Sequence, residues 1–225
     1  MQTLRKTWVP LDVRELFELT SKRGSRLIQS PDELLELLVE CLREIQQEIT
    51  GETSAIRDLW DRTSPPEGWR PIDENDFSDY VVRSLRRRLE AHGVIALREV
   101  EIRRGRAGIP GERTDIHVTG VVQSGDGTFE SVRVIIESKG CWHSELLTAM
   151  ETQLVDRYLH ENECQHGLYL VGWFNCDQWD ADDHRRSRAP AWSVDHAREH
   201  FEGQAHALSN VDRSIRSVVL RCGLS

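Results

Sequence analysis

The sequence predicts an α/β fold, with a mixed central sheet flanked by helices and preceded by an α-helical N-terminal segment. From residue 74 onward the hydrophobic pattern runs in the order helix, three strands, helix, strand, helix, strand. Helices with one apolar stripe and strands with alternating or continuous apolar residues form layered α/β domains when they follow one another in this way. The first sixty residues carry only helical patterns.

The N-terminal part contains two predicted helices. The first begins near Asp12, and the second opens at Ser30 and Pro31, which suit the N-cap and the first helical position. Residues 1–63 show no pattern that would give them a core of their own. We therefore expect a docking or oligomerisation segment. The second helix has one apolar stripe, made of Leu34, Leu35, Leu38, Val39, Leu42 and Ile45.

Residues 63–68 (TSPPEG) are rich in turn formers and lack periodicity. We place a domain boundary here and predict a second domain over residues 72–225. Its predicted helices span residues 75–91, 146–162 and 191–209, and its predicted strands span residues 94–104, 114–122, 131–140, 167–174 and 215–222.

Charge and composition restrict the class of protein. With 38 acidic and 29 basic residues the net charge is −9, which argues against a general nucleic-acid coat protein. Positive charge is nevertheless clustered, either as a phosphate-binding patch or as a solvated helix face with an arginine-rich turn. The cluster comprises Arg83, Arg86, Arg87, Arg88, Arg98, Arg103, Arg104 and Arg106.

Targeting signals and paired cysteines are missing from the sequence. No apolar run is long enough to span a bilayer, and no apolar stretch follows the basic N-terminus as it would in an export signal. The five cysteines are scattered, without the spacing of a zinc site or a disulfide framework. We therefore expect reduced thiols, a cytoplasmic protein and no membrane partner.

Two charged residues stand out at the end of the predicted strand over residues 131–140. Glu137 and Lys139 are two residues apart and project from the same face of that strand. Lys139 is one of only three lysines in the chain. Asp115 lies on the preceding strand, and a hairpin between the two strands brings it beside Glu137. A carboxylate and an ammonium next to an apolar sheet are costly unless they are paired or bind a ligand.

Two carboxylates and a lysine at a strand end suit a hard divalent cation. Mg²⁺ takes oxygen ligands and keeps several waters, which leaves room for a phosphate oxygen. A metal ion in such a site lowers the pKa of a bound water and polarises the phosphoryl group. The alternative interpretation is that Glu137 and Lys139 form a surface ion pair, or that Lys139 caps the strand.

This arrangement resembles the PD-(D/E)xK nuclease superfamily, whose fold is called restriction-endonuclease-like. The motif residues are Asp115 in RTDIHV and Glu137 and Lys139 in VIIESKG, with Thr114 in place of the proline, and the resemblance covers residues 74–175. Members of the family hydrolyse phosphodiester bonds in DNA, less often in RNA, with Mg²⁺ or Mn²⁺. The resemblance implies that Asp115 and Glu137 bind the metal ion and that Lys139 is the catalytic lysine.

Many members of the family complete the metal site with an acid from the first helix. The candidates here are Glu74, Asp76 and Asp79. We prefer Asp79 as the third metal ligand because it sits inside the helical run DFSDYVV. Its alternative is a solvated acid that interacts with the helix dipole.

The helix that follows the Glu-x-Lys strand supplies one more expectation. Some family members place a glutamine there, followed four residues later by a tyrosine, and we carry over Gln153 as a catalytic-site residue. Tyr158 is five residues away, too far for the same face of an α-helix, and is assigned to the core. Trp142 is assigned to packing and His143 to a capping or surface position.

The leading prediction is a Mg²⁺-dependent endonuclease that acts on DNA, as the effector part of a bacterial antiviral defence system. Residues 1–63 would connect it to a larger protein or complex, or to a second copy in a homo-oligomer. The alternative is a catalytically inactive module with the nuclease fold, which binds nucleic acid or a protein partner. The acidic net charge and the helical N-terminal segment support that alternative.

Overall fold

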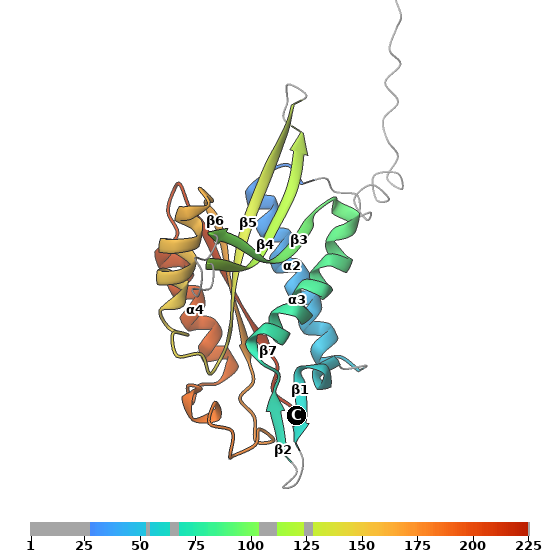
Figure 1. The fold of residues 1–225 in the computed structure, drawn as a ribbon, viewed down its shortest axis with the longest axis vertical. Coiled ribbons are helices and arrows are strands. Elements are labelled where there is room, and N and C mark those ends of the chain that lie inside the picture. Colours follow the sequence, from blue (N-terminus) through green and yellow to red (C-terminus); the bar gives the residue numbers. More distant parts are fainter. Residues whose placement is uncertain (1–27, 53–54, 64–67, 104–111, 124–127, 225) are drawn as a thin grey trace, which may run out of the picture.

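The computed structural model describes residues 28–52, 55–63, 68–103, 112–123 and 128–224. At its centre lies a five-stranded sheet in which strands adjacent in sequence are adjacent in space (Figure 1). The strands are β3 (Ile95–Arg103), β4 (Glu112–Gln123), β5 (Phe129–Gly140), β6 (His166–Trp173) and β7 (Ser214–Arg221).

The sheet is mixed. β3, β4 and β5 pair antiparallel, whereas β5, β6 and β7 pair parallel. Parallel neighbours need crossover connections, and a helix lies between β5 and β6 and another between β6 and β7. The element order predicted from residue 74 onward is therefore confirmed, and with it the mixed α/β class.

Helices cover both faces of the sheet (Figure 1). α2 (Pro31–Thr50) and α3 (Glu74–Leu89) pack on one face. The π-helical segment η4 (Met150–Leu159) and α4 (Val194–Leu208) pack on the other. The shorter elements are η2 (Ala55–Leu59), β1 (Trp60–Thr63), β2 (Gly68–Pro71), η3 (Glu90–His92) and η5 (Arg186–Arg188).

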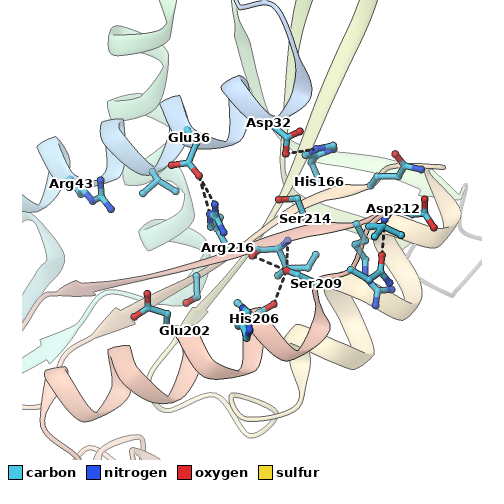
Figure 2. A pocket seen from close by; sticks show the side chains of 18 residues that line it. Asp32, Glu36, Arg43, His166, Glu202, His206, Ser209, Asp212, Ser214 and Arg216 are labelled. Carbon is cyan, nitrogen blue, oxygen red and sulfur yellow. Dashed lines mark hydrogen bonds and ion pairs between the residues drawn. The ribbon is translucent and has the colours of Figure 1, made fainter.

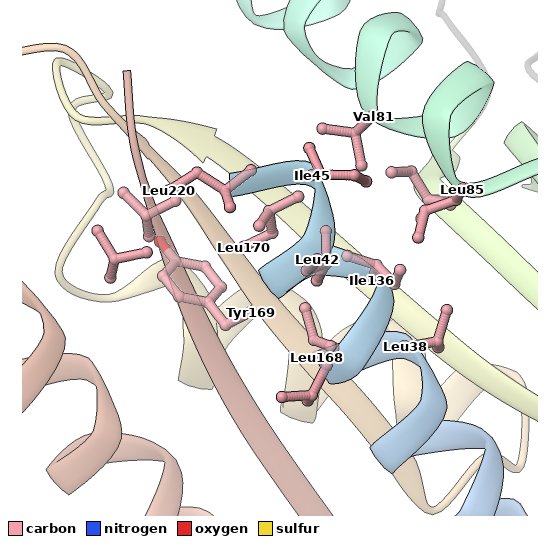
Figure 3. Packing of buried hydrophobic residues seen from close by; sticks show 14 of the residues in the cluster. Leu38, Leu42, Ile45, Val81, Leu85, Ile136, Leu168, Tyr169, Leu170 and Leu220 are labelled. Atoms are coloured by element: carbon pink, nitrogen blue, oxygen red, sulfur yellow. The ribbon is translucent and has the colours of Figure 1, made fainter. Parts of the chain in front are cut away.

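α2 begins as the sequence predicts and then joins the central core. The Ser30 hydroxyl accepts a hydrogen bond from the backbone amide of Glu33 at 3.1 Å, which caps the helix. Its apolar stripe is buried between the sheet and α3 (Figure 3). Leu38 and Leu42 on α2 belong to the same cluster as Ile136 on β5.

This packing differs from the expectation of a separate docking segment over residues 1–63. Residues 31–50 lie in the core that the predicted domain over residues 72–225 also forms. The physical reason is that an isolated amphipathic helix gains most of its stability by burying its apolar face, and the nearest apolar surface is this sheet. Residues 1–27, including the helix predicted near Asp12, lie outside the described residues.

The domain boundary predicted at residues 63–68 falls within a hairpin. β1 and β2 pair antiparallel, with Trp60 opposite Pro71, on either side of residues 64–67, which lie outside the description. The Trp60 indole donates a buried hydrogen bond to the Cys222 carbonyl at 2.7 Å, so the hairpin contacts the C-terminal end of the sheet. Turn formers close hairpins as well as link domains, and the sequence alone does not separate the two cases.

Within the described ranges, no helix has the length and apolar character needed to cross a membrane.

Candidate active site at the end of β5

Glu137 and Lys139 lie inside the protein near the end of β5. Glu137 is 0% exposed and Lys139 is 5% exposed. The Lys139 Nζ lies 2.7 Å from the Glu137 Oε1. A surface ion pair is therefore excluded, because both groups have been withdrawn from water and each lowers the desolvation cost of the other.

The first turn of α3 brings a second carboxylate to this lysine. The Glu74 Oε1 lies 3.5 Å from the Lys139 Nζ, and its Oε2 accepts a hydrogen bond from the Gly140 amide at 3.0 Å. The preceding residue, Asp73, caps α3 by accepting from the Asp76 amide at 2.8 Å. Glu74 is thus the first helical residue, where a negative charge is favoured by the helix dipole.

The next turn of α3 is fixed to β5 by a buried pair of hydroxyls. The Ser78 Oγ and the Ser138 Oγ are 2.5 Å apart, and both side chains are buried. Ser138 lies between Glu137 and Lys139 on the strand. The contact therefore sets the position of α3 along β5, and with it the position of Glu74 relative to Lys139.

Gly140 permits the close approach of the next residues. A Cβ at this position would lie 2.6 Å from the Trp142 ring, so a larger residue would displace the indole. Trp142 is buried and packs edge-on against Trp179 at 5.7 Å between ring centroids, which confirms its predicted packing role. The turn after β5 is therefore held by aromatic packing.

His143 lies beside the same carboxylate. Its Nδ1 accepts a hydrogen bond from the Glu145 amide at 3.1 Å within the turn after β5, and it is not the helix cap, because η4 begins only at Met150. Its Nε2 lies 4.0 Å from the Glu74 Oε1. Because Nδ1 is the acceptor, the ring proton of the neutral form sits on Nε2 and faces Glu74. The sequence analysis assigned His143 to a capping or surface position, because its place beside Glu74 depends on the turn after β5.

The structure does not place Asp79 at this site. The Asp79 Oδ1 forms an ion pair with Arg98 on β3 at 2.8 Å, and its side chain is 54% exposed. Arg98 also donates to the Asn75 side chain at 2.7 Å. Of the three candidate acids, Glu74 is the one that contacts Lys139. Asp79 lies five positions after Glu74 on α3, and this spacing directs Asp79 towards β3.

Asp115 occupies the predicted strand position. It lies in β4 one residue before Ile116, which pairs with Ile136, and Glu137 is the residue after Ile136. The antiparallel register thus brings this stretch of β4 beside Glu137. The Asp115 side chain lies outside the described side chains. Further along β4, burial lowers the pKa of His117, and the charge of Arg133 adds to that shift.

Gln153 lies on η4, where the structure gives it a different partner. Its amide donates to the Glu145 Oε2 at 2.5 Å, on the outside of the protein. Tyr158 is 6% exposed and belongs to the core, as predicted. The π-helical winding of η4 was not predicted. In a π-helix the backbone hydrogen bonds join residues five apart, and this is the spacing of Gln153 and Tyr158.

Most arginines of the cluster on α3 form hydrogen bonds or ion pairs within the fold. The Arg86 Nε donates to the Ala96 carbonyl on β3 at 2.7 Å. Arg88 is paired with Glu48 on α2, at 2.5 Å between Nη2 and Oε1. These contacts attach α3 to its neighbours, whereas Arg83 is exposed.

The arrangement has the donor chemistry of a hard-cation site. Two carboxylates, Glu74 and Glu137, share one ammonium and leave an excess of negative charge that a divalent cation would offset. Among the side chains that the structure describes, no three of His, Cys, Asp and Glu are gathered closely enough to bind a metal ion. That set does not include the side chain of Asp115.

Comparison of the chain with protein-family models, with curated proteins and with solved structures found no match.

Proposed function

We propose that the chain is a metal-dependent nuclease of the PD-(D/E)xK type that hydrolyses phosphodiester bonds of DNA. The observation that supports this proposal is the meeting of Glu137, Lys139 and Glu74 at the end of β5, beside the stretch of β4 that contains Asp115. The element order from α3 to β6 is also the order that the restriction-endonuclease-like fold requires.

Three carboxylates would bind the metal ion, Mg²⁺ or Mn²⁺. They are Asp115, Glu137 and, in place of Asp79, Glu74. A bound ion supplies an acidified water and polarises the scissile phosphate. Glu137 is positioned by the rigid interior of the sheet, and Glu74 by the Gly140 amide.

Lys139 has a separate role. Its ammonium is buried and held between Glu137 and Glu74. In that position it would orient the attacking water and neutralise the charge that develops on the phosphate.

The free cysteines and the acidic charge support the proposed cellular setting. All five cysteines are unbridged, and burial raises the pKa of the Cys141 thiol to about 12, so it is unreactive. We propose a cytoplasmic enzyme used against foreign DNA, as part of a larger protein or complex. With a net charge of −9, binding of DNA would depend on a local positive surface.

A catalytically inactive nucleic-acid-binding or protein-binding module is the second candidate. Its support is that two carboxylates engage Lys139, as in a purely structural ion-pair network. Such networks are retained in some proteins for conformational specificity.

The experiment that tests the proposal incubates the purified chain with supercoiled plasmid, single-stranded DNA and RNA. Each substrate is tested with Mg²⁺, Mn²⁺, Ca²⁺ or EDTA. We expect DNA cleavage with Mg²⁺ or Mn²⁺ and none with EDTA. DNA retention without cleavage under every metal condition would support the inactive module, and equal cleavage in EDTA would contradict a metal-dependent mechanism.

A further inference from the structure

One face of the sheet is open over β3, β4 and the first half of β5. On this side of the sheet, η4 and α4 make their main contacts with β5, β6 and β7. The strand register puts the side chains of the open face on one side, because Ile95 pairs with Thr119, Thr119 pairs with Arg133, and side chains alternate along each strand. We define the open face by Ile95, Leu97, Thr119, Val121, Phe129 and Arg133.

The open face holds four of the six large apolar side chains that are exposed in the described part of the chain. These are Ile95 at 61%, Leu97 at 48%, Val121 at 59% and Phe129 at 71%. On the opposite side of the same strands, Val118 and Val134 are 0% exposed. Scattered apolar side chains on a surface need no explanation, but a contiguous exposed patch marks a surface that another segment or molecule covers.

The N-terminal end of α2 lies directly behind the open face. A Cβ added to Gly120 would lie 4.0 Å from the Leu34 side chain, which belongs to the first turn of α2. Thr119 and Val121, on either side of Gly120, belong to the open face. Residues 1–27 therefore join the described part of the chain immediately behind the patch.

The way around the sheet is short at this level. β3 pairs with β4 only as far as Thr119, and β6 pairs with β5 only from Ile135, so the β4–β5 hairpin projects beyond its neighbours (Figure 1). A layer packed on either side of a sheet lies about 10 Å from it, and the two strands of the hairpin are about 4.8 Å apart. When extended, residues 18–27 span up to about 33 Å, which is enough to connect α2 with the open face.

Residues 1–27 lie outside the described residues, but their sequence matches the open face. Val13, Leu16 and Phe17 recur at the spacing that places apolar residues on one side of a helix. The predicted helix over residues 12–18 has three acids and one arginine, so its net charge is −2. The charge of Arg133 on the open face has the opposite sign, and the described side chains of that face include no acid.

The cavity beside β7 offers no comparable surface for an apolar segment. It has a volume of about 650 Å³ and lies between α2 and α4 (Figure 2). Its walls carry paired charges, with Asp32 3.1 Å from His166 and Glu36 2.7 Å from Arg216. Apolar side chains placed there would remove charged groups from water without supplying hydrogen bonds to them.

We propose that residues 1–27 fold back over the β4–β5 hairpin and cover the open face, with Val13, Leu16 and Phe17 against its apolar residues. A second copy of the chain suits the face less well, because a two-fold contact between like patches brings both Arg133 side chains into the same interface. The open face continues along β5 to Glu137, so the covering segment borders the candidate active site. The contact itself does not depend on the proposed nuclease reaction.

The test measures the rate of N-ethylmaleimide labelling in the full chain. One variant carries Val121→Cys on the open face. The other carries Val211→Cys, at a residue that is 100% exposed and lies outside the open face. Peptide mass spectrometry follows each introduced cysteine separately, and each rate is divided by that of the same variant unfolded in urea. We expect labelling at position 121 to be at least about tenfold slower than at position 211, because a covered site reacts only after local opening.

A charged residue in the contact should expose position 121. Adding Phe17→Asp to Val121→Cys should raise its labelling rate at least about fivefold, because the contact then buries an unpaired carboxylate. The matched change Ser21→Asp adds the same charge outside the apolar stripe and should leave labelling slow. The native Cys141 is buried and serves as an internal control, since general unfolding would label it as well.

Two outcomes would overturn the proposal. Equal normalised labelling rates at positions 121 and 211 would show that the chain leaves its open face uncovered. Slow labelling that survives Phe17→Asp would show that residues 1–27 are not the cover. If that protection also rises with protein concentration and light scattering detects a dimer, a second copy of the chain is the occupant instead.

Discussion

Lys139 is held between two carboxylates that come from different elements. Glu137 shares its strand, and Glu74 reaches it from the start of α3. Glu74 is itself positioned by the Gly140 amide and lies within 4.0 Å of His143. In the proposed metal site, Glu74 rather than Asp79 is therefore the acid that α3 supplies.

The first prediction concerns which acid of α3, Glu74 or Asp79, binds the metal ion. Glu74→Gln removes one negative oxygen donor and should weaken Mn²⁺ binding by at least about tenfold to a hundredfold, as losses near metal sites do. Asp79→Asn should leave Mn²⁺ affinity within about twofold, because it breaks only an exposed pair with Arg98. Calorimetric titration with Mn²⁺ measures both. Weakened Mn²⁺ binding in Asp79→Asn but not in Glu74→Gln would show that Asp79, rather than Glu74, binds the metal ion.

A second acid, Asp183, lies outside the site and controls stability. It is buried within the loop after β6, where its Oδ2 accepts from the Trp179 indole at 3.0 Å and from Arg185 at 2.8 Å. Burial opposes ionisation, but the hydrogen bonds from Arg185 and Trp179 outweigh it and lower the pKa of Asp183 from 3.8 to about 2.

The second prediction follows from the sign of that shift. A depressed pKa in the folded state stabilises the fold above pH 3.8, and this contribution of about 2 kcal/mol is lost as the pH falls from 3.8 to about 2. Asp183→Asn should be less stable than the wild type at pH 7, and the difference should shrink below pH 3.8. Urea unfolding at several pH values measures it. A difference independent of pH would contradict the assigned pKa.

At the scale of secondary-structure elements, α2 is part of the central core, although the sequence predicted that residues 1–63 form a docking segment. Its side chains Leu38, Leu42 and Ile45 are fully buried against the sheet (Figure 3). Glu36 on the same helix pairs with Arg216 on β7 at 2.7 Å. The helix thus covers one face of β5, β6 and β7, and its loss would expose that face to water.

The third prediction tests this role. Leu42→Ala should lower the free energy of unfolding by about 2–5 kcal/mol, as expected for a large-to-small change in a rigid core. The matched change Leu37→Ala, at a partly buried position on the same helix, should cost clearly less. Urea unfolding followed by tryptophan fluorescence measures both. Equal costs would show that α2 is not packed as described.

At the scale of the whole molecule, the sequence predicted the layered α/β class and every strand of the main sheet. It did so because strand and helix periodicities are local properties of the chain. It also singled out Glu137 and Lys139, since an acid and a rare lysine two residues apart on an apolar strand are visible locally.

What the sequence did not predict depends on contacts between distant elements. The choice of Glu74 follows from how α3 is rotated against β5, which the Ser78–Ser138 contact fixes. The inclusion of α2 in the core follows from which apolar surface is nearest after folding. The π-helical winding of η4 and the hydrogen bonds between the Gln46 side chain and the Arg221 backbone on β7 likewise arise from tertiary packing rather than from local pattern.

The measurement that tests the central claim most directly is the rate of supercoiled-plasmid cleavage with Mn²⁺ by the wild type and by Lys139→Ala. The exposed Arg83→Ala serves as the matched control for loss of a positive charge. We predict metal-dependent cleavage by the wild type, a loss of at least about a hundredfold in Lys139→Ala, and a much smaller loss in Arg83→Ala. Cleavage at the wild-type rate by a folded Lys139→Ala variant would contradict an active site at the end of β5.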